Sequence, residues 1–235
     1  MIICSGACNS YYYSLRQLIN NLVGMGKGNH FFYIFNLGLH PKRWEFLKSR
    51  PNVKNDQRFV WVEMPWDKFA PHYRDLQTYA FKSACLKYIR DHINGQVVMW
   101  MDSACLLEAR ATEIEEMVRR YKVYSPYSAA DIEKWCHPTT IERMGYCGSI
   151  NHSMRSGGLF AVDLSSPVGI AFLENYHRIM AYENIVCPLG SNKSNHRQDQ
   201  SVLTILYWQF ADNKDFPVVD EWIGLSFHNN IFPNE

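Results

Sequence analysis

The chain has 235 residues, enough to bury a substantial hydrophobic core, and we expect one domain over residues 1–235. Its 47% hydrophobic and 20% charged content excludes a largely disordered protein, and its formal net charge of +1 argues against a nucleic-acid partner. Neither a run of about 18 apolar residues nor a basic leader is present, so we expect a cytoplasmic protein without a membrane span. Seven widely spaced cysteines without a CxxC pair favour reduced thiols. The oligomeric state stays open.

The first half of the chain alternates short apolar runs with segments of helical periodicity, which is typical of an α/β layered structure. The pattern predicts a first strand over 2–4 that runs into a small-residue turn at Ser5-Gly6-Ala7. Further strands are expected at 31–35, 58–63 and 97–101, and helices at 12–23, 41–47 and 75–92. The strand at 97–101 is apolar throughout, as in the buried centre of a mostly parallel sheet.

The second half is predicted to hold a helix over 112–121, an irregular stretch up to Arg155, and a strand over 158–164. A helix over 167–184 follows, with Ser166 as its N-cap and Pro167 in its first turn, and a last helix over 199–210. No repeat or linker divides the chain. The fold class we predict is therefore α/β: a single Rossmann-like domain with a mostly parallel central sheet flanked by helices.

Asp102 directly follows the apolar strand at 97–101. Ligands of open α/β sheets bind outside the carboxyl ends of the strands, and Mg²⁺ or Mn²⁺ bridges carboxylates and phosphates in many nucleotide sites. The residues alone leave two interpretations open. Asp102 is either part of such a site or an exposed acid at the end of a strand.

Four short motifs occur in a fixed order along the chain: YAFKSACL, VVMWMDSACL, SGGLFAVDL and RQDQSVLTIL. With this set, from residue 1 to about 222, the chain resembles the GT-A glycosyltransferases, particularly small enzymes of large DNA viruses and related uncharacterised eukaryotic proteins. The resemblance implies a single GT-A-like domain. It also implies transfer of a hexosyl or pentosyl group from a UDP- or GDP-sugar donor to a hydroxyl of a glycan or glycoprotein acceptor.

The resemblance also assigns donor-binding residues. The first loop is expected to receive the base and ribose, and a basic residue at position 82 to approach the diphosphate. Two glycines allow the backbone to pass close to the donor sugar. The nucleotide-sugar-binding residues expected in this way are Ser5, Gly6, Ala7, Lys82, Asp102, Ser103, Gly157 and Gly158.

A divalent cation, Mn²⁺ or Mg²⁺, is implied by the same family. Asp102 matches one acid of its Asp-x-Asp metal motif, but Trp100 stands two residues before it and Ala104 two residues after it, so only one carboxylate is present. A lone Asp102 either holds the cation with water and phosphate ligands or bonds the ribose. His228 matches a C-terminal histidine that is a metal ligand in some GT-A families, although a lone histidine is more often structural.

Asp199 and Gln200 match an acid–amide pair near the reacting sugar carbon, and we expect them to be the catalytic residues. The transition state of glycosyl transfer resembles an oxocarbenium ion and is stabilised by a nearby negative charge. The alternative interpretation is that Asp199 caps the last helix. Retention or inversion at the anomeric carbon stays open.

Two other interpretations compete with the transferase, and the role of one loop is open. The chain can be a catalytically inactive nucleotide-sugar or carbohydrate-binding module on the same fold, since the second metal acid is missing. A zinc site can form from Cys136, His137, Cys147 and His152, although their spacing lacks a paired metal motif. The aromatic loop at 64–73 can stack on an acceptor sugar or pack over the edge of the sheet, and packing is the favoured interpretation.

Overall fold

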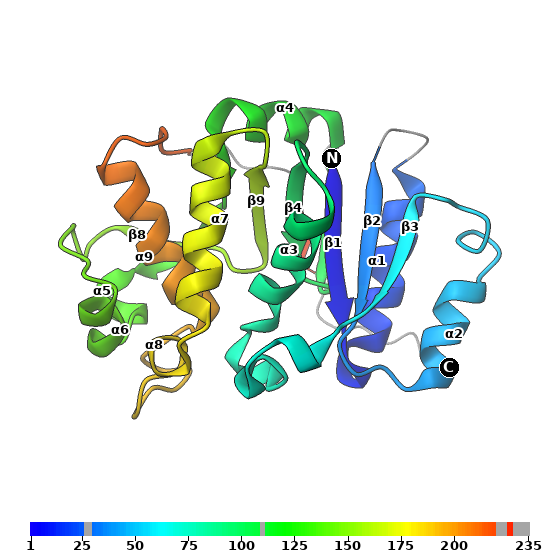
Figure 1. The fold of residues 1–235 in the computed structure, drawn as a ribbon, viewed down its shortest axis with the longest axis horizontal. Coiled ribbons are helices and arrows are strands. Elements are labelled where there is room, and N and C mark those ends of the chain that lie inside the picture. The colour runs from blue at the N-terminus through cyan, green and yellow to red at the C-terminus, as the bar shows by residue number, and fades with distance from the viewer. Residues whose placement is uncertain (26–29, 109–110, 220–224, 228–235) are drawn as a thin grey trace.

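The computed structural model describes residues 1–25, 30–108, 111–219 and 225–227. Its centre is a six-stranded sheet with the strand order β3-β2-β1-β4-β9-β6 (Figure 1). The first four of these strands pair in parallel, and β9 runs antiparallel to both β4 and β6. The mostly parallel sheet that the sequence predicts is confirmed. The strands of this sheet are β1 Ile2–Ala7, β2 Phe31–Asn36, β3 Phe59–Glu63, β4 Val97–Met101, β6 Val123–Tyr124 and β9 Leu159–Asp163.

Both faces of the sheet are buried, and successive side chains of a strand enter different hydrophobic clusters because their directions alternate. In β4, Val98 and Trp100 join one cluster, whereas Val97 and Met99 join the other. All five residues of β4 are buried. This double burial explains why its sequence is a continuous apolar run instead of an alternating one.

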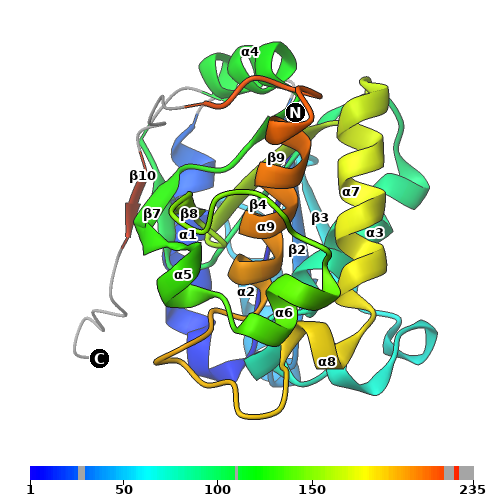
Figure 2. The same ribbon diagram turned by 90° about the vertical axis from the view of Figure 1, so that its left-hand side faces the viewer.

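Helices cover each face and complete a three-layer α/β/α arrangement. The cluster on one face includes side chains of α1 Tyr12–Gly24, α2 Pro41–Ser49 and α4 Ala111–Tyr121. The cluster on the other face includes side chains of α3 Phe81–His92, α7 Pro167–Met180 and α9 Asp199–Asp212. Helix α9 lies beside α7 (Figure 2), and no described helix is long and apolar enough to span a bilayer.

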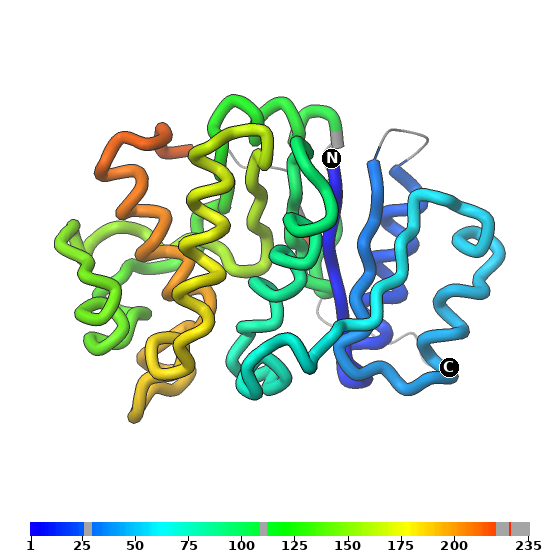
Figure 3. The backbone as a smooth tube through the Cα atoms, in the orientation of Figure 1, coloured from blue at the N-terminus to red at the C-terminus, as the bar shows by residue number. Residues whose placement is uncertain are grey.

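The segment from 122 to 155, which we expected to be irregular, contains short elements. They lie at the β9 end of the molecule, next to α9 (Figure 3). Each is too short for a periodic pattern to reveal. The short elements of the chain are β5 Cys105–Leu107, β7 Tyr127–Asp131, α5 Ile132–Trp135, α6 Pro138–Arg143, β8 Ser153–Arg155, α8 Glu183–Val186, β10 Leu225–Phe227 and 3₁₀ turns at Asn9–Tyr11, Trp66–Lys68, Pro71–Tyr73 and Leu76–Thr78.

Two predicted helices have wrong boundaries. The helix expected over 75–92 begins only at Phe81, because Tyr79 takes a left-handed conformation with φ of 57° that an α-helix excludes. The helix expected over 167–184 ends at Met180 and is followed by the separate turn of α8. Ser166 is at the N-cap of α7 as predicted, but its side chain makes no capping hydrogen bond.

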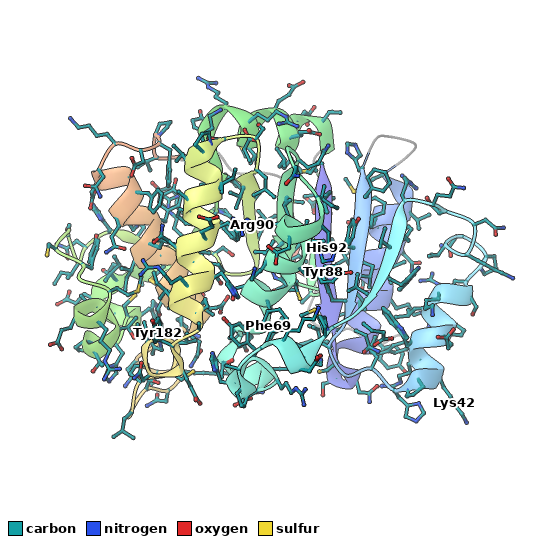
Figure 4. The ribbon with its side chains drawn as sticks, viewed as in Figure 1. Lys42, Phe69, Tyr88, Arg90, His92 and Tyr182 are labelled. Atoms are coloured by element: carbon teal, nitrogen blue, oxygen red, sulfur yellow. The ribbon has the colours of Figure 1, made fainter. Side chains whose placement is uncertain are left out.

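The aromatic loop at 64–73 packs against the helices. Phe69 (Figure 4) lies 5.5 Å from the Tyr73 ring and 6.3 Å from the His177 ring of α7. The loop therefore packs on α7, and its Met64 and Tyr73 belong to the same hydrophobic cluster as Val62 of β3. Nearby, Arg90 of α3 (Figure 4) forms an ion pair with Glu174, which ties α3 to α7.

The predicted turn at Ser5-Gly6-Ala7 is wrong, because β1 continues through all three residues. They pair with Ile34, Phe35 and Asn36 of β2. Small side chains belong here for a packing reason instead. A Cβ atom on Gly6 would lie 2.7 Å from the carbonyl oxygen of Phe35 and 3.0 Å from the side chain of Leu37.

We therefore expect Gly6→Ala to lower the free energy of unfolding by about 1–3 kcal/mol, the usual cost of overpacking. The conflict involves a backbone oxygen, which side-chain rotation does not relieve. Urea unfolding followed by circular dichroism measures the loss. Gly24→Ala is the matched control, since a Cβ there meets nothing within 4 Å. Equal midpoints for the two variants would contradict the close approach at Gly6.

Candidate active site

Two adjoining cavities lie at the carboxyl ends of β1 and β4. The larger has a volume of about 610 Å³ and the smaller about 230 Å³, and Tyr79 and Asp102 line both. Gly6, Ala7 and Ser103 line the larger cavity. The smaller is lined by Tyr79, Lys82, Asp102, Gly157, Gly158, Lys193, Arg197, Gln198, Asp199 and Gln200. A wider groove of about 1050 Å³ between α6, α7 and α9 is not lined by the described residues predicted to bind the donor or to catalyse transfer.

Lys82 lines the smaller cavity and contacts two acids there. This side chain comes from the first turn of α3, is only 4% exposed, and its Nζ donates a hydrogen bond of 2.8 Å to the carbonyl oxygen of Gly157. The same Nζ lies 3.1 Å from Oδ1 of Asp102 and 3.1 Å from Oδ2 of Asp199. The contact with Asp199 is ionic, since Oδ2 has no hydrogen-bond partner among the described residues. One ammonium thus joins two acids from different parts of the chain.

Asp102 belongs to this cluster and still faces the cavity. Its Oδ1 accepts a hydrogen bond of 2.7 Å from Nε1 of Trp100, and its backbone N–H donates to the carbonyl oxygen of Gly158 at 2.8 Å. Its side chain is 34% exposed. The end of β4 and the indole of Trp100 therefore hold the carboxylate at the cavity, and its role in ligand binding stays a prediction.

Asp199 is almost completely buried at the start of α9. Burial raises the pKa of its carboxyl group to about 6, and the positive charge of Lys82 opposes that rise. The interpretation of Asp199 as a helix cap is wrong, because Gln198 is the N-cap and Asp199 is the first helical residue. Gln198 has φ of 43°, a strained conformation for a residue other than glycine. Such strain concentrates at functional sites.

At Gly157 the backbone passes close to Asp199 and Gln200. A Cβ atom on Gly157 would lie 3.0 Å from Oδ2 of Asp199 and 3.2 Å from Cβ of Gln200. The absence of a side chain therefore makes room for Asp199. The predicted contact of Gly157 with a donor sugar stays a prediction.

The structure gathers most of the predicted residues in the two cavities. Ser5 is the exception within the described chain, since it is buried in β1 and lines neither cavity. His228 lies outside the described residues, so its role as a metal ligand stays a prediction.

No family model matches the chain, and no curated protein matches its sequence. Solved structures, however, share its fold. The galactosyltransferase LgtC in complex with donor and acceptor sugar analogs matches with a TM-score of 0.55 at 13% identity, over 97% of this chain and 87% of that one. Mouse xyloside xylosyltransferase 1 matches with a TM-score of 0.53 at 10% identity, over 98% and 97% of the two chains. The bifunctional glycosyltransferase WbbM matches with a TM-score of 0.59 at 11% identity, over 88% of this chain and 37% of WbbM.

The fold is that of GT-A glycosyltransferases. The expected fold is therefore confirmed, and at 10–13% identity the likeness extends to the fold alone. The resemblance to enzymes of large DNA viruses stays a prediction.

Four residues that line the smaller cavity were not predicted from the sequence: Tyr79, Lys193, Arg197 and Gln198. Three of them belong to the polar loop SNKSNHRQ directly before α9. Its position next to the predicted catalytic pair was a usable signal. The sequence gives no such signal for Tyr79, because this residue fits the apolar period of the helix expected over 75–92.

The described residues around Asp102 do not fit the divalent cation that the resemblance implies. The ammonium of Lys82 contacts the carboxylate that would bind the cation, and Oδ1 also accepts the hydrogen bond from Trp100. Ala104 offers no side-chain oxygen. Among the described residues, no three His, Cys, Asp or Glu side chains gather as a metal cluster.

The alternative zinc site is not assembled either, because its members have separate partners. The Cys136 thiol lies 3.8 Å from Sδ of Met154 in the core, and Nδ1 of His152 lies 2.8 Å from the Tyr146 hydroxyl. Nδ1 of His137 accepts a hydrogen bond from the backbone of its own helix, α6. Cys147 is exposed.

Proposed function

We propose that the protein is a glycosyltransferase that moves a hexosyl or pentosyl group from a UDP- or GDP-sugar to a hydroxyl of a glycan or glycoprotein. The observation that carries this proposal is the Asp102–Lys82–Asp199 cluster in the smaller cavity, in which Asp102 also lines the larger one. The cavities have volumes of about 610 and 230 Å³, which fall in the range of small-molecule sites when they are joined. The fold shared with glycosyltransferases supports the reaction class by analogy.

The donor is expected to lie across both cavities. The nucleoside fits the larger one, where Gly6, Ala7 and Ser103 leave space beside β1 and β4. The sugar then enters the smaller cavity and reaches Asp199 and Gln200. The carboxylate of Asp199 would stabilise the positive charge that develops at the anomeric carbon as the bond to the diphosphate breaks. Gln200 would orient the sugar by hydrogen bonds to its hydroxyl groups.

A thermal-shift panel of UDP- and GDP-sugars tests the proposal first. A donor at about 100 times its Kd adds roughly 2.7 kcal/mol to the free energy of unfolding, so one donor should raise the Tm clearly above the others. The same donor should then release its nucleoside diphosphate slowly without an acceptor. Release of intact donor only would support the inactive binding module instead. If every donor leaves the Tm unchanged, the proposal fails.

A further inference from the structure

We propose that Arg197 and Lys193 bind the diphosphate of the donor and that Lys82 takes the place of a divalent cation beside Asp102, so that donor binding needs no metal. This inference rests on the proposed glycosyl transfer. It departs from the metal dependence implied by the family resemblance, and it assigns a role to two residues that the sequence motifs do not include.

The charge of Lys82 is fully used inside the protein. Its Nζ donates hydrogen bonds to the carbonyl oxygen of Gly157 and to Oδ2 of Asp102, and it forms an ion pair with Asp199. The side chain is 4% exposed. Lys82 therefore offsets one of the two negative charges of Asp102 and Asp199, and these internal contacts leave the diphosphate to other cationic groups.

A divalent cation at Asp102 would meet the same ammonium. A metal ion bound about 2.1 Å from Oδ1 would lie within roughly 5 Å of Nζ of Lys82, since the two protein atoms are 3.1 Å apart. Like charges at this distance repel strongly in a partly buried site. The side chain of Ala104 supplies no compensating oxygen.

The loop before α9 supplies the smaller cavity with positive charge that is not paired with a described acid. Three cationic and two acidic side chains line this cavity, which gives a formal surplus of one positive charge. Lys82 is paired with both acids, whereas Lys193 and Arg197 form no ion pair with a described residue. The free cationic groups are therefore on the loop before α9.

Arg197 is held in a way that leaves its donors free. Its guanidinium stacks on the ring of Trp135 at 3.8 Å, and its backbone N–H donates to Oγ of Ser201 at 3.0 Å. No described residue accepts a hydrogen bond from the guanidinium. A stacked guanidinium still presents its N–H edge, which matches two phosphate oxygens at once.

The loop itself is anchored, so the two cations have a fixed place. Nε2 of the buried His196 lies 2.8 Å from the carbonyl oxygen of Val186. On the other side, the backbone N–H of Asn192 donates to Oδ1 of Asn195, and the N–H of Ser194 donates to Oδ1 of Asn192. These bonds close a compact turn around Lys193, which is exposed at the rim of the cavity.

Isothermal titration with UDP and with GDP, each in EDTA and in Mn²⁺, tests the inference. We expect one of them to bind in EDTA with a Kd within about threefold of its value in Mn²⁺. Arg197→Gln should weaken this binding roughly 10- to 100-fold, as expected for hydrogen bonds to a charged group. It should leave the Kd of the corresponding nucleoside, uridine or guanosine, unchanged, which a general structural defect would not do. Lys193→Gln should weaken binding less, because Lys193 is more exposed.

Arg143→Gln on α6 is the matched control, because Arg143 lines the separate groove and not the two cavities. Binding that requires Mn²⁺ would overturn the inference and leave the proposed function intact. Equal losses in the Arg197 and Arg143 variants would also overturn it. If neither UDP nor GDP binds in either condition, the proposed function itself fails. Lys193→Gln keeps the test decisive if Arg197→Gln does not fold, because Lys193 is exposed and a substitution at an exposed position changes the free energy of unfolding little.

Discussion

Asp199→Asn is expected to lower kcat for release of the nucleoside diphosphate on the order of 10³-fold. Asparagine keeps the shape of the side chain but removes the negative charge that would face the anomeric carbon. Lys82 keeps Asp102 and the carbonyl oxygen of Gly157 as partners, so the fold should survive the change. Steady-state donor hydrolysis, with the Tm measured in parallel, checks both expectations.

The matched control is Asp212→Asn at the other end of α9, roughly 20 Å away at 1.5 Å of rise per residue. This variant should retain wild-type kcat. Donor binding should persist in Asp199→Asn, because the diphosphate contacts proposed above do not involve its carboxylate. A variant that keeps most of its activity would remove Asp199 from the reaction and leave it a structural partner of Lys82.

The fold was predictable because its strongest signals are local. The strands β2, β3 and β4 are rich in apolar residues, so the sequence of each strand indicates by itself that the strand is buried. Asp102 was predictable for the same reason, since a carboxylate after a buried strand stands out. The order of the motifs then placed Lys82, Gly157 and Asp199 at one site.

The rest depends on contacts between distant parts of the chain. The continuation of β1 through Gly6 is decided by its pairing with Phe35, and the late start of α3 by the left-handed Tyr79. Neither is encoded in a periodic pattern. The pairing of Lys82 with two acids was also hidden, because Asp102 follows β4 and Asp199 begins α9. Sequence alone suggested a lysine that approaches phosphate, whereas its surroundings show a lysine that holds two acids.

Lys82→Met is expected to lower the free energy of unfolding by about 3–5 kcal/mol at pH 7.5, the usual result of removing one partner of a buried ion pair. The variant leaves Asp199, which is 4% exposed, facing Asp102 without the ammonium between them. Lys87→Met on the exposed side of α3 is the control. Its ion pair with Asp91 is at the surface, so its loss should cost no more than about 1 kcal/mol.

The pH dependence separates this electrostatic loss from simple misfit of the methionine. Burial already raises the pKa of Asp199 to about 6, and without Lys82 the pKa must rise further. In the unfolded variant Asp199 loses its proton near pH 4, whereas in the folded variant it keeps the proton to a higher pH. The free energy of unfolding of the variant is therefore highest below about pH 4, and it falls as the pH rises through the pKa of Asp199 in the folded state. The deficit relative to wild type should therefore shrink at pH 5, and Asp199→Asn in the same chain should restore part of it at pH 7.5. An equal deficit at both pH values would mean that Lys82 acts through packing, and the proposal that it replaces a cation would lose its electrostatic basis.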